Sequence, residues 1–256
     1  MRPQKQLLTI LLAAMYQCSF AQSEDHPKKI SHFSGSIGVT QNGISLVPTF
    51  SLGDPAALVM LSVGKGRLSF EPDLRFALEG KPWSFLFWWR YKAVDNPKFR
   101  LRVGAHPALN FRTQTITVNG DEQEAILTRR FLAGELAPNY FLTKNISVGM
   151  YYLYGRGFQK TTARNTHFLT VNTNFSSIPV AGPFYLQFTP QVYYLRQDKD
   201  DGFFVTATLT AARKNFPFSV SSIVNKELSS DIPGAKDFVW NVTLTYSFGK
   251  QYVVKN

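Results

Sequence analysis

The stretch Phe238-Val-Trp-Asn-Val-Thr-Leu-Thr-Tyr-Ser-Phe248 decides the fold of this chain. Every second residue in it is apolar or aromatic, and most residues between these are small and polar. Because successive side chains of a β-strand point to opposite faces of the sheet, this period of two predicts a strand with one apolar and one polar face. Taken alone, the stretch fits any half-buried β-sheet.

The same alternation recurs along most of the chain, between short clusters of turn residues. In residues 202–213, for example, Phe203, Val205 and Leu209 alternate with threonines. Alternating segments bounded in this way predict β-strands. We expect about twelve, over residues 43–52, 56–63, 67–78, 82–94, 98–113, 124–141, 145–158, 164–177, 183–197, 202–213, 217–228 and 238–249, with 33–41 as a further strand or as the start of the first.

The N-terminal residues have the pattern of a secretory signal peptide. Arg2 and Lys5 precede the apolar run 7–15, and Ser19-Phe-Ala21 places small residues before a cleavage site. The run is shorter than the roughly 20 residues that a transmembrane helix needs, and no later apolar stretch reaches that length. We therefore expect residues 1–21 to be removed during export.

The composition limits the classes of function. Cys18 is the only cysteine and lies within the expected signal, so the exported chain would have no disulfide and no cysteine chemistry. Without Arg2 and Lys5, 26 basic residues remain against 17 acidic ones, but they are spread along the chain and form no dense basic stripe. We expect no nucleic acid partner. The positive charge fits anionic lipid headgroups or anionic solutes better.

The signal ending Ser19-Phe-Ala21-Gln22, the alternating strands from about residue 43 onward and the closing stretch 242–248 resemble the outer-membrane β-barrel proteins of Gram-negative bacteria. The resemblance implies an all-β fold, a transmembrane antiparallel up-and-down barrel of about 12 strands that follows a cleaved signal peptide. It also implies a place in the cell outer membrane, contact with outer-membrane lipid, and the barrel-assembly machinery as a partner during biogenesis. The oligomeric state stays open.

The resemblance extends to the C-terminal assembly signal of such proteins, which usually ends the chain in an aromatic residue. Here eight residues follow Phe248, which departs from that pattern. We expect a signal peptide (1–21), a mobile periplasmic leader (22–32), an outer-membrane barrel (33–249) and a periplasmic tail (250–256). The residues that match the assembly signal are Trp240, Val242, Leu244, Tyr246 and Phe248.

The connections between the expected strands differ in length in an alternating way. Segments such as 155–165 and 227–236 are long and charged, whereas most connections of the alternate set, such as 95–98, are short. Outer-membrane barrels have short periplasmic turns and longer outer loops, so the pattern fits a barrel with both termini in the periplasm. The first two connections of the long set, 53–55 and 79–81, are short and depart from it.

If the apolar faces of the strands contact lipid, the alternate residues face the interior. In 82–94 the outward stripe would consist of Trp83, Phe85, Phe87, Trp89 and Tyr91. Four consecutive strands between residues 67 and 141 would then carry a lumen-lining charged wall, and the last four strands would line their side with Thr, Ser, Asn and Gln. The wall residues are Arg67, Glu71, Asp73, Arg75, Arg90, Lys92, Arg100, Arg102, His106, Arg112, Arg129 and Glu135.

This wall has two interpretations, which can hold together. Eight basic residues against three acidic ones would favour anions in a water-filled pore. Alternatively, the charges pair with one another in a network that fills a narrow barrel, because charges removed from water must be paired.

Catalysis by the chain is not expected. Outer-membrane phospholipases place a His and a Ser two residues apart on an outward strand face, but the His-x-Ser of this chain, His32-Phe-Ser34, lies next to the leader. His106 beside the acidic wall residues fits paired interior charge better than a metal ligand. The sequence has no phosphate-binding glycine loop and no clustered metal-ligand motif, so we expect no cofactor and no metal.

The leading hypothesis is therefore a passive outer-membrane channel, or porin, for small solutes, with anions favoured. The first alternative is a non-conducting barrel with a structural or surface-interaction role, and the second is an outer-membrane lipid enzyme. A soluble periplasmic β-sandwich is the broader rival, and it would need the outward aromatic residues to meet across a core.

Overall fold

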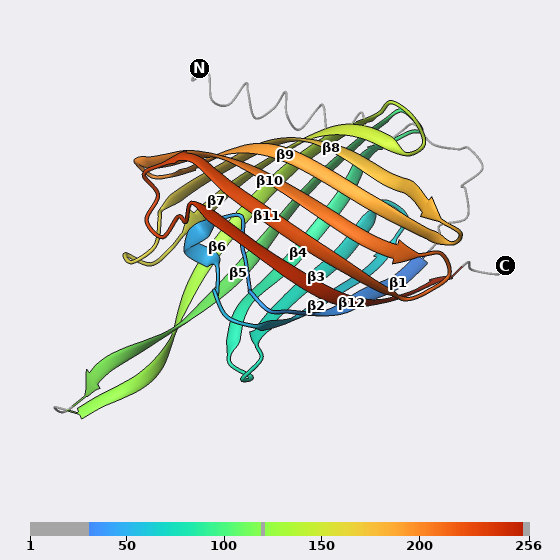
Figure 1. The fold of residues 1–256 in the computed structure, drawn as a ribbon. Helices are drawn as coiled ribbons and strands as arrows, with labels where there is room; N and C mark the ends of the chain where they lie inside the picture. Colours follow the sequence, from blue (N-terminus) through green and yellow to red (C-terminus); the bar gives the residue numbers. More distant parts are fainter. Residues whose placement is uncertain (1–30, 119–120, 253–256) are drawn as a thin grey trace, which may run out of the picture.

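Residues 31–118 and 121–252, which the computed structural model describes, form a closed antiparallel barrel of twelve strands (Figure 1). Each strand pairs with its neighbours in the sequence, and β1 pairs with β12 to close the barrel. The predicted up-and-down transmembrane barrel is confirmed, while the expected signal peptide lies outside the described residues. The strands are β1 (Ser31–Thr40), β2 (Ala56–Lys65), β3 (Leu68–Ala77), β4 (Pro82–Asp95), β5 (Phe99–Val118), β6 (Asp121–Phe141), β7 (Ile146–Gly157), β8 (Asn165–Ala181), β9 (Phe184–Gln197), β10 (Asp200–Arg213), β11 (Phe218–Ser230) and β12 (Phe238–Tyr252).

The closing strand β12 shows how the two faces of the barrel differ. Trp240 and Leu244 are 50% and 47% exposed on the outer surface, whereas Asn241 and Thr243 are buried. Buried side chains of a closed barrel point to its interior, so the apolar side chains of this strand face outward. The alternation that the sequence predicted for this strand is confirmed, and its exposed apolar face suits contact with lipid.

The ends of β1 and β12 set the limits of the barrel. Ser31 pairs with Tyr252, and Thr40 pairs with Thr243. β1 therefore includes residues 31–32, which the sequence assigned to a leader, and β12 includes residues 250–252, which it assigned to a tail. Residues 249–252 lengthen the ladder that closes the barrel.

The strand predicted over residues 43–52 is wrong, because β1 already ends at Thr40. Residues 41–55 instead form an inward segment, with a short 3-10 helix η1 (Pro48–Phe50). Figure 1 shows it at the end of the barrel opposite to the start of β1 and the end of β12. Gly53 has a φ of +87°, and a proline cannot donate a ladder hydrogen bond, so the segment is unsuited to a central strand. No helix in residues 31–118 and 121–252 is long and apolar enough to cross a membrane.

The connections at the two ends of the barrel differ only in part as the sequence predicted, because β9 and β10 are joined by residues 198–199 alone and most of the predicted loop 115–123 is strand. We call the end where β1 begins and β12 stops the terminal end, and the opposite end the distal end. The first distal connection is longer than expected, because the residues predicted as a strand belong to it. The terminal turns are the short segments 66–67, 96–98, 142–145, 182–183 and 214–217, whereas the distal connections include 41–55, 158–164 and 231–237.

Beyond the distal end, β5 and β6 continue as a two-stranded hairpin (Figure 1). β4 pairs with β5 only as far as Asn110, and β7 pairs with β6 only from Phe131. The Lys81 ammonium, in the β3–β4 turn, donates to Glu124 of the hairpin at 3.1 Å and lies 3.3 Å from Glu79. Both hydrogen bonds raise the pKa of Lys81, the one to Glu124 most.

A register shift in β4 turns one residue of the predicted outward stripe into the barrel. Arg75 pairs with Ser84 but the next residue, Phe76, pairs with Pro82, so Trp83 is the extra residue of a bulge. Trp83 is 1% exposed and faces the interior, whereas Trp89 on the same strand is 53% exposed. The outward assignment of Trp83 is therefore wrong, because a single extra residue reverses the side-chain parity.

Candidate functional site

The centre of the interior wall is the buried carboxylate of Glu135 on β6, whose side chain is fully buried. Nε of Arg90 donates to Oε1 of Glu135 at 2.8 Å, and Nε of Arg102 donates to the same oxygen at 3.0 Å. The Tyr151 hydroxyl donates to Oε2 at 3.0 Å. Arg90 also donates to Glu71 on β3. Five neighbouring strands, β3 to β7, thus share one network, in which the buried carboxylate has the partners that burial requires.

A second ion pair lies beside this network on β3. The Arg75 guanidinium donates to both carboxylate oxygens of Asp73, at 2.9 and 2.6 Å. This two-point geometry is the strong form of a charge-assisted hydrogen bond. The Arg75 guanidinium also lies 5.3 Å from the centre of the Trp83 ring, so the inward-turned tryptophan covers it.

His106 on β5 lies against an aromatic side chain. The centres of the His106 and Trp88 rings are 3.9 Å apart, and the Arg90 guanidinium is 4.2 Å from the centre of the Trp88 ring. His106 is 4% exposed, with Nδ1 3.3 Å from the Pro107 carbonyl oxygen. Within the described residues, no group of three His, Cys, Asp or Glu side chains is placed to hold a metal ion.

The inward segment is attached to the wall by hydrogen bonds to its backbone. Nε1 of Trp83 donates to the Phe50 carbonyl oxygen at 2.7 Å, and the Arg112 guanidinium donates to the carbonyl oxygens of Ser51, at 2.8 Å, and Thr49. On the opposite wall, the Gln197 amide donates to the Thr49 hydroxyl at 3.2 Å. The segment therefore spans the barrel interior from β4 and β5 to β9.

Next to the inward segment, large apolar side chains fill the distal part of the interior. Tyr193, Leu195 and Phe204 are all at most 1% exposed, and the rings of Tyr193 and Phe204 stack at 4.8 Å. The sequence assigned polar residues to this side of the interior, and at the distal end that assignment is wrong. The distal apolar cluster consists of Phe168, Tyr193, Leu195, Phe204 and Ile232, with Leu46 and Val47 of the inward segment packed against it.

Open space remains toward the terminal end. A cavity of about 510 Å³ is bordered by Lys92, Arg100 and Arg102 and by the polar side chains of Asn139, Ser147, Asn172, Asn174 and Thr189. A smaller cavity of about 230 Å³ lies between β1, β2, β3, β11, β12 and the inward segment, and Asp73, Arg75 and Trp83 border it.

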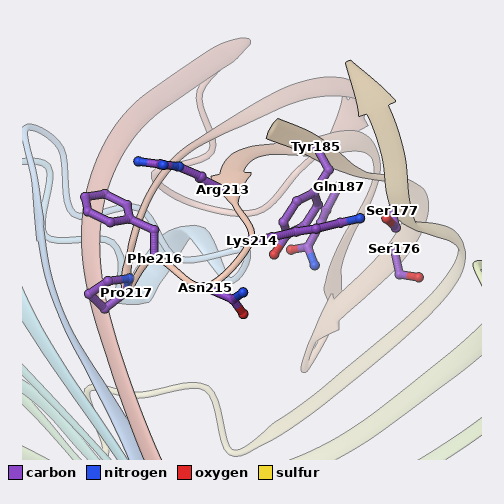
Figure 2. A pocket seen from close by; sticks show the side chains of 9 residues that line it. All are labelled: Ser176, Ser177, Tyr185, Gln187, Arg213, Lys214, Asn215, Phe216 and Pro217. Carbon is purple, nitrogen blue, oxygen red and sulfur yellow. The ribbon is translucent and has the colours of Figure 1, made fainter. Parts of the chain in front are cut away.

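At the terminal rim, a hollow of about 700 Å³ opens between the β8–β9 and β10–β11 regions (Figure 2). Figure 2 shows the Lys214 side chain pointing toward Tyr185 and Gln187, whereas the Arg213 side chain lies near Phe216. Lys214 therefore adds one basic side chain to this hollow, whereas Arg213 lies over the exposed rings of Phe184 and Phe216.

The remaining predicted wall residues lie outside the charged network. Arg67 is in the β2–β3 turn and donates to the Ala93 carbonyl oxygen at 3.3 Å. Arg100, whose side chain is 57% exposed, pairs with Asp95 at 3.1 Å. Arg129 on β6 is half-buried. It lies two residues from Leu127, which is the ladder partner of Arg112 on β5. Apart from Arg67, the predicted wall residues lie on the expected strands β3 to β6, but nothing in the sequence indicated that Arg112 holds the inward segment.

The described histidines offer little support for a lipid hydrolase. Nε2 of His32 is 2.9 Å from the Ser62 hydroxyl, but this pair lies on the inward face of β1 and β2. Within the described residues, no acidic side chain is hydrogen-bonded to His32. On the outer surface, Nδ1 of His167 is 2.8 Å from the Tyr152 hydroxyl. A serine and a histidine therefore do not converge on the lipid-facing side of the described barrel.

Solved structures that resemble this fold are outer-membrane barrels. The KdgM porin has a TM-score of 0.52 at 12% identity, covering 84% of this chain and 99% of KdgM. The NanC porin has a TM-score of 0.48 at 12% identity (84% and 98%), and a loop-deletion mutant of OmpT, an outer membrane protein of Vibrio cholerae, has 0.44 at 9% (88% and 100%). No family model and no curated protein matches the chain. The chain thus has the fold of a small, porin-like outer-membrane barrel, and the likeness to KdgM supports that fold alone.

Proposed function

We propose that the protein resides in the outer membrane and is a passive channel for small solutes that favours anions. The observation that carries the proposal is the basic lining of the terminal cavity, where Lys92 and Arg102 border open space. Rings or walls of basic side chains attract anions into a pore and repel cations. The closed barrel with its apolar outer surface supports the location in the membrane.

The charge of the interior remains positive after pairing. Glu135 and Glu71 are neutralised by Arg90 and Arg102, and Asp73 is neutralised by Arg75. Lys92, Arg112 and Arg129 add positive charge, and none of these three is paired with a carboxylate of the described residues. The low-dielectric wall of the barrel focuses this field into the lumen, which raises the local concentration of anions over that of cations.

The interior of the barrel is filled at the distal end. The inward segment crosses the interior there, and the distal apolar cluster occupies the space next to it. This supports a second candidate function, a sealed barrel that acts through its outer loops. Because a few side-chain hydrogen bonds hold the inward segment, we favour a narrow channel whose width depends on the position of that segment.

Uptake into proteoliposomes tests the anion preference. The rate for gluconate is compared with the rate for glucose, a neutral solute of similar size. Lys92→Glu with Arg100→Glu should lower the rate ratio of gluconate to glucose, because both charges at the terminal cavity are reversed. The two substitutions spare Arg102, which Glu135 needs as a partner.

The matched control is Lys65→Glu with Lys250→Glu, which reverses two charges on the outer face at the same end of the barrel. It should leave the rate ratio unchanged. If wild-type protein shows no preference for gluconate, or if both double variants change the ratio equally, the basic wall does not select the solute.

A further inference from the structure

A row of basic side chains follows the outer surface at the distal end, over β6 to β9. Arg130 on β6, Arg156 on β7 and Arg196 on β9 are exposed, and His167 on β8 lies between the last two. We call these four residues the outer basic strip. Their parity places them outside, because the residues next to them, Phe131, Gly157, Phe168 and Leu195, are buried in the interior.

The strand register brings these side chains together. His167 pairs directly with Arg196, and its other ladder partner is Tyr154, two residues before Arg156. Arg156 pairs with Leu132, two residues after Arg130. Side chains directly opposite each other lie about 5 Å apart and diagonal ones about 7–8 Å apart. One ligand group can therefore contact neighbouring members of the strip at the same time. Figure 1 shows β7, β8 and β9 side by side.

The guanidinium groups of the strip are available to a ligand. Within the described residues, Arg130, Arg156 and Arg196 form no ion pair with a carboxylate. Nε of Arg196 donates to the Asp198 carbonyl oxygen at 2.9 Å, which holds the side chain at the rim. Asp201 of β10 is the ladder partner of Arg196, but its carboxylate accepts a hydrogen bond from the Tyr194 hydroxyl at 2.9 Å.

The residues below the strip indicate its depth in a membrane. Tyr154 and Tyr152 lie two and four residues from Arg156 along β7, toward the middle of the barrel, and the Tyr152 hydroxyl is 2.8 Å from Nδ1 of His167. Leu169 pairs with Tyr152, and Val192 on β9 lies one ladder step farther in; both side chains are exposed and face outward. Tyrosines concentrate at the boundary between hydrocarbon and headgroups. The strip therefore lies at the level of the lipid headgroups.

We propose that the outer basic strip binds the phosphorylated headgroup of a lipid in the leaflet at the distal end. The forked guanidinium matches phosphate oxygens in pairs, and three arginines over four adjacent strands suit a headgroup with more than one phosphate. The inference rests on the proposed outer-membrane location and does not depend on conduction. It predicts that the lipid is held at β6 to β9 and not around the whole rim.

The test uses the full mature chain refolded in detergent, with retention of lipid A measured by native mass spectrometry. Wild-type protein should retain lipid A with both phosphates and lose lipid A from which the phosphates are removed. Arg130→Gln with Arg156→Gln and Arg196→Gln should weaken retention by at least about tenfold, because each basic side chain near an anionic lipid contributes on the order of a few-fold or more. The control Lys65→Gln with Lys98→Gln and Lys144→Gln removes three exposed charges at the terminal end and should retain lipid A as wild type does.

Folding of every variant is checked by its heat-dependent migration on a gel. Equal retention by the strip variant and wild type, or equal retention of the dephosphorylated lipid, overturns the proposal. Displacement of lipid A by millimolar inorganic phosphate would show a site for free phosphate and would also overturn it. The strip variant should conduct as wild type does. If neither protein conducts, the channel proposal fails, but the comparison of lipid retention between the two proteins remains valid.

Discussion

Trp83 and Phe50 join the wall of the barrel to the inward segment. The indole Nε1 of Trp83 donates to the Phe50 carbonyl oxygen at 2.7 Å, and Trp83 reaches it only because a bulge in β4 turns the side chain inward. The Arg112 guanidinium holds the two neighbouring residues of the same segment. Two side chains thus fix the position of the element that narrows the interior.

Trp83→Phe should lower the free energy of unfolding by about 1–3 kcal/mol, because it leaves the Phe50 carbonyl oxygen without its donor while keeping an aromatic ring. Urea unfolding of the refolded barrel in lipid vesicles, followed by tryptophan fluorescence, measures the change. Trp89→Phe is the matched control, because Trp89 is 53% exposed on the outer surface. Equal effects of both substitutions would contradict this role of Trp83.

Arg112→Met should increase the conductance of the barrel. The substitution removes the donors that hold Thr49 and Ser51, so the inward segment is freer to leave the interior. Arg129→Met removes a nearby interior charge without releasing a described backbone contact. Single-channel recordings should therefore show larger openings for Arg112→Met than for Arg129→Met. Unchanged or smaller openings for Arg112→Met would mean that the segment does not limit conduction.

Glu135→Gln should destabilise the barrel by about 3 kcal/mol or more. The change removes the buried charge that compensates Arg90 and Arg102, and an unpaired buried charge is costly. Glu124→Gln, which removes an exposed partner of Lys81, should change the free energy of unfolding by less than about 1 kcal/mol. Comparable urea midpoints for the two variants would show that the network is not important for stability.

Leu195→Ala tests the distal apolar cluster. Leu195 is fully buried, so the loss of its side chain should lower the free energy of unfolding by about 2–5 kcal/mol through the cavity that it leaves. Val192→Ala on the same strand removes a side chain that is 52% exposed and should have a smaller effect. Urea unfolding in vesicles compares the two, and a larger loss for Val192→Ala would contradict an interior core at this end.

The sequence predicted the parts of the fold that depend on strict alternation. The strands β2 to β12, the outward parity of β12 and the strands that carry Glu71, Arg90 and Glu135 follow from the period of two, which a lipid-facing barrel imposes on every strand. The period carries no information about a segment that leaves the sheet. Residues 43–52 contain apolar residues like a strand, yet they pack Leu46 and Val47 against the distal apolar cluster.

The misplaced residues have a common physical origin. One extra residue in β4 reverses the parity of Trp83, and nothing in the local pattern marks the position of that residue. Three large side chains, Tyr193, Leu195 and Phe204, point into the interior, where the inward segment packs against their cluster and excludes water. This packing depends on contacts between distant parts of the chain. The flanking turns Asn42-Gly43 and Gly53-Asp54-Pro55 are the signals that mark the ends of the segment.

The reversal potential of the wild-type barrel in a planar bilayer tests the central claim most directly. With a tenfold gradient of potassium chloride, we expect discrete openings whose reversal potential is displaced toward the chloride equilibrium potential. A reversal potential displaced toward the potassium value would contradict an anion-favouring interior. The absence of openings for protein that migrates as a folded barrel would contradict the channel itself.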